Sequence, residues 1–420
     1  MNIYINRTSA IGLVIGLIGA LLIVSCKKDK TNKSGGGTNG PVITSISIGS
    51  ALPTSVIIIT GKNFSTNITN NSVTINGETA VVDSVNATQV WFTVPADAQS
   101  GIIKLVTGGT TVSYATIFKV TSPTFSWYQS DTVYMEHIVI DAANNIFGDN
   151  GTDTVYKMPV GSKAKAFAII PPTNTTYNEL WGTAIDSLGN IYEVSSSARK
   201  IYKITPAGAV STLAGSGAQG YTDAQGASAV FYSPLGLAID KAGNLYTNDK
   251  HCVRKITPAG LVSTVAGNGT DGLIDGPAKS AEFGNTEGIA VDAQGNIFVS
   301  DNEKLNIRKI STAGIVSTFA GSGTAGFDDG QGKNAQFYYP QAMAIDAAGN
   351  LFVADNEFDT QFYYTVRMIN REGLVTTFAN SNTANVTFTD GIAFDKQGDI
   401  FICNTLNTWQ GASITEGIFK

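Results

Sequence analysis

Short hydrophobic runs that end in aspartate and a turn recur through residues 123–420. In each copy an apolar run ends in Ile, Val or Phe followed by Asp, and a turn then leads into a second run that begins with Ile or Leu and an aromatic residue. The aspartates of this signature are Asp141, Asp186, Asp240, Asp292, Asp346 and Asp395, spaced by 45 to 54 residues. One such unit cannot bury its own faces, so the units are expected to pack side by side into a continuous core.

One copy, residues 286–320, contains four short runs with the alternation typical of strands. They cover residues 288–292, 297–301, 306–310 and 315–320, with glycine turns between them. Four antiparallel strands make one propeller blade. Six copies therefore predict a six-bladed β-propeller, and the whole chain is expected to be all-β.

The last copy predicts how the ring closes. After Asp395 only three strands fit before the chain ends. A β-like run at residues 124–128 precedes the first copy, and we expect it to supply the fourth strand of the last blade. Such closure removes two exposed sheet edges.

The repeated Gly-Ile/Leu-Ala-x-Asp-x-x-Gly-Asn-Ile/Leu-Tyr/Phe-Val motif and the later Arg-Lys-Ile segments resemble the NHL-repeat family of β-propellers. The resemblance covers about residues 123–420 and implies the fold. It leaves the function open, because that family includes binding modules, scaffolds and a few lyase- or lactonase-like enzymes.

Residues 41–122 form a separate predicted domain without a helical stretch. Alternating runs at 55–60, 72–76, 89–94 and 101–106 are separated by Gly, Asn and Pro, which favours a small β-sandwich. The runs resemble the IPT/TIG immunoglobulin-like family over nearly the whole segment. The domain is interpreted as a spacer that lifts the propeller, with a ligand site of its own as the alternative.

The first 40 residues indicate export. Arg7 precedes an apolar run at residues 10–24, which is short for a membrane span but suits a secretory signal. The run ends in Ile-Val-Ser and Cys26, which resembles the bacterial lipobox. We therefore expect residues 1–25 to be a lipoprotein signal peptide, Cys26 to carry the lipid, and residues 26–40 to be a flexible tether. A plain signal peptide followed by an ordinary cysteine is the alternative. The resemblance implies an outer-membrane lipoprotein, at the cell surface or on the periplasmic face.

Charge and histidine content narrow the function. The formal net charge of −6 gives no electrostatic support for nucleic-acid binding. The two histidines, His137 and His251, are too few for a three-histidine zinc site. We therefore assign no catalytic residue, cofactor or metal from the sequence, and Ca²⁺ binding stays open.

Positions that differ between the copies indicate specialised roles. Nine residues after the signature aspartate, an Asp occurs only in the copies that also carry an Arg in the third strand. We expect structural ion pairs, because losing one partner would leave the other charge uncompensated. The pairs are Asp249 with Arg254, Asp301 with Arg308, and Asp355 with Arg367. Long loops between the copies repeat Asp223, Asp275 and Asp329, for which a structural role and a weak Ca²⁺ role are both open.

The most variable position lies five residues before the signature aspartate, where the innermost strand begins near the mouth of the central channel. It holds Glu136, Trp181, Leu235, Glu287, Gln341 and Asp390. An indole face with carboxylates suits a sugar, and carboxylates alone suit a cation. A solvated rim with one buried Trp is the alternative. Loop aromatics Tyr232, Tyr338 and Tyr339 are further candidates to line a ligand surface.

The favoured interpretation is a non-catalytic, surface-anchored binding protein, expected to be a monomer. The combination of modules resembles lipoproteins of Gram-negative polysaccharide-capture systems, so a glycan is the leading ligand. A scaffold that docks a partner protein is one alternative. A metal-dependent lactonase- or lyase-like enzyme that uses Glu136, Glu287 and Asp390 with Ca²⁺ is another.

Overall fold

The computed structural model describes residues 40–47, 50–51, 56–95, 98–120, 123–130, 133, 135–159, 162–171, 178–357, 363–381, 388–405 and 412–419. The predicted signal peptide, Cys26 and the tether lie outside these residues. Pro41–Lys420 form one compact unit. Within the described part of the chain, no helix is long and apolar enough to span a membrane.

The first domain is an all-β, immunoglobulin-like fold built around a core that includes Ile57, Ile59 and Phe92. Its strands are hydrogen-bonded in the order β1-β3-β6-β5-β4-β7-β8-β2. β5 pairs with β4 at its start and with β6 further along, so one strand serves two sheets. The elements are β1 (Val42–Ile46), β2 (Ser50–Ala51), β3 (Val56–Lys62), η1 (Ile68–Asn70), β4 (Asn71–Ile75), β5 (Glu78–Val85), β6 (Gln89–Thr93), β7 (Gly101–Thr107) and β8 (Thr110–Val120).

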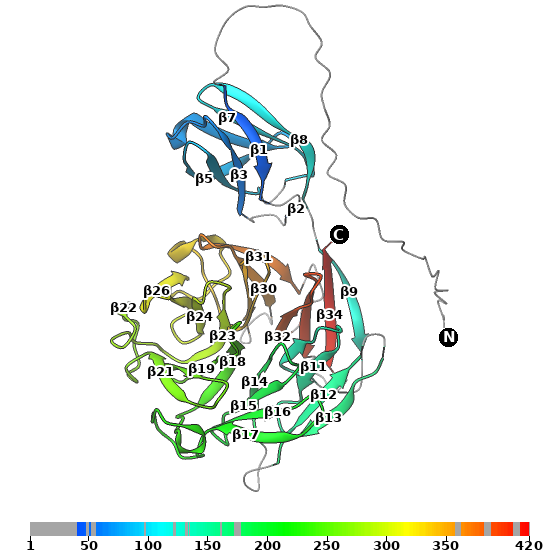
Figure 1. Cartoon of the computed structure of the whole chain (residues 1–420), viewed down its shortest axis with the longest axis vertical. Helices are drawn as coiled ribbons and strands as arrows, with labels where there is room; N and C mark the ends of the chain where they lie inside the picture. Colours follow the sequence, from blue (N-terminus) through cyan, green and yellow to red (C-terminus); the bar gives the residue numbers. More distant parts are fainter. Residues whose placement is uncertain are drawn as a thin grey trace, which may run out of the picture. The chain divides into compact units, whose positions relative to one another are not determined.

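The rest of the chain forms a propeller-like ring (Figure 1), in which five blades are built from consecutive strands. The first three blades are β10 (Ile138–Ile140), β11 (Ile146–Asp149), β12 (Thr154–Met158) and β13 (Lys165–Ile169); β14 (Leu180–Ile185), β15 (Ile191–Ser195), β16 (Lys200–Ile204) and β17 (Val210–Ala214); and β18 (Pro234–Ile239), β19 (Leu245–Asp249), β20 (Cys252–Ile256) and β21 (Val262–Ala266). η2 (Gly226–Ser228) lies in the loop between the second and third blades.

The fourth and fifth blades each gain a short outer strand from the long loop that follows the preceding blade, because β22 pairs with β26 and β27 pairs with β31. The elements are β22 (Gly276–Pro277), β23 (Thr286–Val291), β24 (Ile297–Asp301), β25 (Asn306–Ile310) and β26 (Ile315–Ala320), followed by β27 (Gly330–Gln331), η3 (Gly332–Asn334), β28 (Pro340–Ile345), β29 (Leu351–Asn356), β30 (Tyr364–Ile369) and β31 (Leu374–Asn380).

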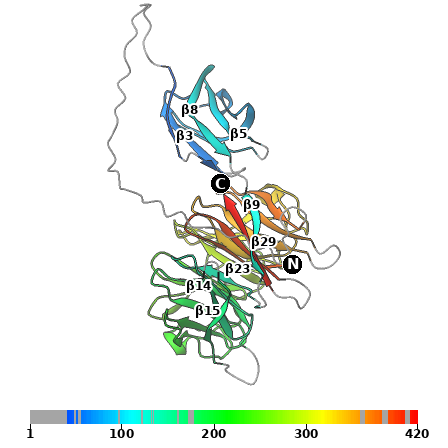
Figure 2. The same ribbon diagram turned by 90° about the vertical axis from the view of Figure 1, so that its right-hand side faces the viewer.

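A further sheet joins the two ends of the ring. It contains β32 (Phe388–Phe394), β33 (Ile400–Thr405), β34 (Ala412–Phe419) and β9 (Pro123–Ser130). β9 includes the run at 124–128 and pairs antiparallel with β34 from Pro123 opposite Phe419 to Ser130 opposite Ser413. Both views draw β9 beside the red β34 (Figures 1 and 2).

The signature aspartate stabilises the turn between the first two strands of a blade. Asp240 accepts hydrogen bonds from the backbone N–H groups of Ala242 and Asn244, both at 2.9 Å, and from Asn244 Nδ2 at 2.8 Å. Gly243 takes a φ of 81°, a left-handed conformation that glycine adopts without strain. The motif recurs because each blade needs the same turn.

Large aromatic side chains fill the space between neighbouring blades. Phe231, Phe283 and Phe337 are fully buried, and each precedes the innermost strand of its blade. Phe231, for example, packs with Val194 of the second blade and Leu245 of the third. The faces that one sheet cannot bury alone are therefore covered by the next sheet in the ring.

Each of the three Asp–Arg pairs is present, and each arginine also binds a second aspartate. Arg254 Nη1 lies 2.7 Å from Asp249 and its Nη2 lies 2.9 Å from Asp223. The equivalent second partners of Arg308 and Arg367 are Asp275 and Asp329, both at 2.8 Å. These contacts give the three loop aspartates a structural role.

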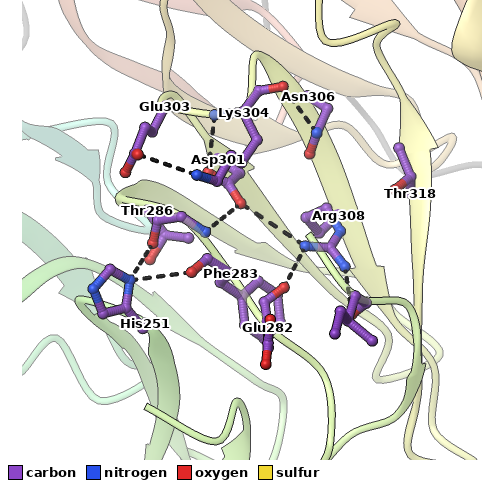
Figure 3. A network of polar contacts seen from close by, with 12 residues as sticks. His251, Glu282, Phe283, Thr286, Asp301, Glu303, Lys304, Asn306, Arg308 and Thr318 are labelled. Atoms are coloured by element: carbon purple, nitrogen blue, oxygen red, sulfur yellow. Dashed lines mark hydrogen bonds and ion pairs between the residues drawn. The ribbon is translucent and has the colours of Figure 1, made fainter. Parts of the chain in front are cut away.

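Figure 3 shows the arrangement around Arg308, which lies over the Phe283 ring with its guanidinium carbon 4.9 Å from the ring centroid. Its Nη1 donates to the Glu282 carbonyl at 2.8 Å and lies 3.8 Å from Asp301. Arg308 and Asp301 are both fully buried. The buried arginine therefore ties the inter-blade loop to the second and third strands of its blade.

Candidate functional site

A cavity that is partly open to solvent lies at the centre of the ring. Its lining comes from β14, β18, β23, β28 and β32, with His137 and Ile138 from the first blade. The ring brings together four of the predicted ligand residues, because the lining includes Trp181, Glu287, Gln341 and Asp390. Trp181 is 40% exposed, so the alternative of a buried indole is wrong.

Repeated strand irregularities direct these side chains to the cavity. The pairing of the innermost strand with its neighbour shifts register between Leu180 and Gly182, and the unpaired residue is Trp181. Equivalent shifts occur in β23, β28 and β32, and they enclose Glu287, Gln341 and Asp390. A bulge leaves a residue outside the hydrogen-bonded ladder and re-aims its side chain. In these four repeats the most variable residue therefore faces the channel.

Glycines beside the bulges keep the channel narrow. A Cβ on Gly288 would lie 1.9 Å from the carbonyl oxygen of Gln341, and one on Gly236 would lie 2.3 Å from that of Glu287. Neighbouring innermost strands therefore approach backbone to backbone. The same position in the first blade carries His137 instead, whose side chain lines the cavity.

A hydrogen-bond network holds Glu287 in place. The Tyr339 hydroxyl donates to one carboxylate oxygen at 2.9 Å, and Gln341 Nε2 donates to the other at 3.0 Å. Asn356, which the sequence analysis missed, donates to Gln341 Oε1 at 2.7 Å. Burial, followed by the Glu287 carboxylate, raises the pKa of Tyr339, so its hydroxyl stays a donor at neutral pH. The network orients a carboxylate at the cavity wall before any ligand arrives.

Glu136 belongs to a different group, formed with His137 and Asp149. One ligand atom from each of these three residues lies within 4.8 Å of the others. His137 Nδ1 is 2.9 Å from Asp149 Oδ2, and the His137 ring centroid is 6.4 Å from that of Trp181. Burial alone lowers the pKa of His137, but Asp149, Glu136 and Asp390 together raise it to about 9. Sequence reasoning missed Asp149, which follows no repeated pattern.

The His137 pair predicts a pH dependence of stability. The folded-state pKa of about 9 exceeds the ordinary 6.5, so the stabilisation is fully present below pH 6.5 and lost as pH rises through 9. The shift corresponds to roughly 3 kcal/mol. Urea unfolding in the presence of a chelator should show the unfolding free energy falling across this range in the wild type. His137→Gln should flatten this part of the profile; an unchanged slope would contradict the assignment.

Tyr232 and Tyr338 lie in the inter-blade loops rather than in the cavity lining. Tyr232 stacks on Tyr221 with a centroid distance of 5.2 Å, and the Lys250 ammonium lies 4.8 Å from its centroid. Tyr338 stacks on Phe327 at 5.8 Å. These two pairs pack within the loops, whereas the Tyr339 hydroxyl contacts Glu287 of the cavity lining.

Residues 41–120 match the IPT/TIG domain family. Among curated proteins, the chain is 34% identical over 94 residues to the chloroplast protein SUPPRESSOR OF QUENCHING 1 of Arabidopsis thaliana, covering 22% of this chain and 9% of that protein. It is 30% identical over 216 residues to human Teneurin-4, covering 44% of this chain and 8% of that protein. The matches thus span less than a tenth of either relative.

Solved structures share the fold over most of the chain. A Bacteroides thetaiotaomicron protein of unknown function superposes with a TM-score of 0.56 at 17% identity, covering 91% of this chain and 99% of that one. A Bacteroides ovatus auxiliary nutrient binding protein gives a TM-score of 0.51 at 15% identity, covering 91% and 99%. A Xanthomonas campestris gluconolactonase gives 0.51 at 13%, covering 71% and 90%. At such identities the similarity concerns the fold alone.

Proposed function

We propose that this protein is a non-catalytic, surface-anchored binding protein that captures a glycan in the central cavity. The observation that carries the proposal is the exposed Trp181 in a cavity that also holds Glu287, Gln341 and Asp390. Fold neighbours described as auxiliary nutrient binding proteins support a binding role.

The lining suits the two surfaces of a sugar ring. An indole covers the apolar C–H face of a pyranose, while carboxylate oxygens accept hydrogen bonds from its hydroxyl groups. Glu287 is held by Tyr339 and Gln341, so it loses little conformational freedom when a ligand binds. The cavity thus combines an apolar platform with oriented acceptors.

We extend the proposal to anchoring and ring closure. Lipidation at Cys26 would tether the folded unit to the outer membrane through residues 26–40, as the lipobox resemblance implies. The sheet of β32, β33, β34 and β9 would count as a sixth blade. The contacts of innermost strands support this count, because β32 touches both β28 and β10.

Replacing Trp181 by alanine should lower glycan affinity about tenfold or more, since truncating an aromatic anchor that the ligand covers removes about 1.4 kcal/mol or more. A glycan array on residues 41–420, which form one compact unit, would identify the ligand. Calorimetry with that glycan would then compare wild type, Trp181→Ala and Leu235→Ala. Leu235 occupies the equivalent position in the third blade and is absent from the cavity lining, so its variant should bind normally.

The proposal fails if no glycan binds, or if Trp181→Ala retains full affinity. In the first case a docked partner protein becomes the better explanation, and capture of that protein from outer membranes is the next step.

Glu287 and Asp390 in one cavity also suit a lactonase-like enzyme. Hydrolysis of a sugar lactone that Glu287→Gln abolishes would favour that second candidate.

A further inference from the structure

Beside the cavity, the boundary between the first two blades contains an unusual group of ionisable side chains. Glu136 and His137 immediately precede β10, and Asp149 ends β11. The Asp149 side chain is fully buried and that of His137 is 16% exposed. Besides its contact with His137, the Asp149 carboxylate accepts a hydrogen bond from the Gly151 N–H at 2.7 Å. In the described part of the chain, no lysine or arginine pairs with Asp149.

An independent feature of the second blade faces the same place. Glu193 on β15 is fully buried, and neither of its carboxyl oxygens makes a hydrogen bond of ordinary geometry. Burial raises its pKa well above the usual value, and the Asp149 carboxylate raises it further, while the Thr183 hydroxyl lowers it. A buried carboxyl group without a hydrogen bond of ordinary geometry is costly, so the native protein is expected to satisfy it.

Strand alternation shows where Glu193 points. Residues two apart on a strand share a face, so Glu193 lies on the face of Ile191 and Asp149 lies on the face of Phe147. Ile191 and Phe147 belong to one core cluster between the first and second blades. Glu193 therefore faces the first blade, toward the group formed by Glu136, His137 and Asp149.

Comparison of the repeats shows that this group is local to one boundary. The position of His137 carries Gly or Ala in the other five copies. The position of Glu193 carries Gly, Thr, Val, Val and Ile in the other copies, and that of Asp149 carries Val, Asn, Ser, Ala and Cys. The turn and the inter-blade packing therefore do not require these ionisable residues. Three residues that differ from those of the other copies therefore lie at one boundary between blades, which indicates a common role.

We propose that Glu136, His137 and Asp149 bind a divalent transition-metal ion, Zn²⁺ first, with the buried Glu193 carboxyl group as an outer partner of the site. Two ligand atoms on one Zn²⁺, each about 2.0–2.2 Å from the ion, lie roughly 3–3.5 Å apart. Without an ion, His137 Nδ1 and Asp149 Oδ2 form a hydrogen bond of 2.9 Å, so a small separation of the two side chains would admit the metal, and one ligand atom of each of the three residues already lies within 4.8 Å of the others. An imidazole ligand favours Zn²⁺ or Mn²⁺ over Ca²⁺, which takes oxygen ligands.

The three ligands belong to the first blade, so the site would reach the second blade through Glu193 on β15. It would lie at the cavity wall, because His137 also lines the cavity. Glycan capture is not needed for this inference. A bound ion would stabilise the folded state in proportion to its affinity and concentration.

Titration calorimetry of the EDTA-treated full chain with ZnCl₂ is the direct test. We expect one equivalent to bind, and His137→Gln to weaken the affinity by about 100-fold or more, since even the loss of an outer-shell partner costs about 10–100-fold. His251→Gln is the matched control: it removes the other histidine, whose Nδ1 contacts the backbone oxygens of Phe283 and Gly284. This variant should bind as the wild type does.

A spectroscopic readout separates ligation from folding. Co²⁺ in place of Zn²⁺ should give visible absorption bands that His137→Gln and Asp149→Asn both abolish, while circular dichroism shows each variant folded without metal. Glu193→Gln should retain the bands but weaken Co²⁺ binding by about tenfold. No saturable binding by the wild type, or equal loss in His251→Gln, would overturn the proposal.

Discussion

Replacing Arg254 by leucine is expected to lower the free energy of unfolding by about 3–5 kcal/mol, the usual cost of breaking a buried ion pair on one side. Arg254 and Asp249 are both fully buried and lie 2.7 Å apart. Burial raises the pKa of Asp249 even though Arg254 lowers it, so desolvation outweighs pairing. Without the arginine, Asp249 would be left as an uncompensated buried charge. Urea denaturation of residues 41–420 would measure the loss.

The double variant Arg254→Leu with Asp249→Asn is the matched control. Asp249 accepts hydrogen bonds from the backbone N–H groups of Tyr232 and Ser233 at 2.7 and 2.8 Å. Asparagine keeps an oxygen that can accept these bonds, and it removes the charge. We expect the double variant to regain about 2 kcal/mol relative to the single one. Additive losses would contradict the pairing account. The first and last copies of the repeat lack both Asp and Arg at these positions and carry Asn150 and Asn404 in place of the aspartate.

Gly288→Ala is expected to cost about 3 kcal/mol or more, because the added methyl group would lie 1.9 Å from a backbone oxygen of the next innermost strand. The backbone oxygen of Gln341 cannot rotate away as a side chain does, so two blades would have to separate. The thermal unfolding midpoint and the urea midpoint of residues 41–420 would both fall.

Ala342→Gly tests the same ring position in the opposite sense. The fifth blade already accommodates a Cβ there, so its removal should cost only about 0.5–1 kcal/mol through added backbone freedom. Similar losses for the two variants would show that the spacing of the innermost strands does not control stability. If Gly288→Ala is tolerated within about 0.5 kcal/mol, the close approach of the two strands is wrong.

Most of the ring architecture could be predicted from the repeat because each element depends on local chemistry. The turn at Asp240 and Gly243 depends only on residues close in the sequence, so the motif predicts this turn in every copy. The pairing of Asp249 with Arg254 was visible because both residues appear and disappear together among the copies. The convergence of Trp181, Glu287, Gln341 and Asp390 followed from their shared place in the repeat and from the predicted ring.

The second aspartate bound by each buried arginine, and the detailed geometry of the cavity, could not be predicted from local sequence patterns. Asp223 lies 31 residues before Arg254, and the inter-blade loop alone decides that they meet. Tyr339 reaches Glu287 across 52 residues. The strand irregularity at Trp181 depends on how β14 pairs with β15. Such contacts arise from the packing of one blade on the next.

The amino-acid sequence by itself determined the all-β repeat, the turns and the set of variable positions, because these depend on alternation and on residues close in the chain. Only the tertiary structure decided that Asp149 lies beside both His137 and Glu193, and which of the variable residues line the cavity. The physical reason is that a blade buries its faces only against its neighbours. Contacts across blade boundaries therefore depend on ring closure, which no local pattern encodes.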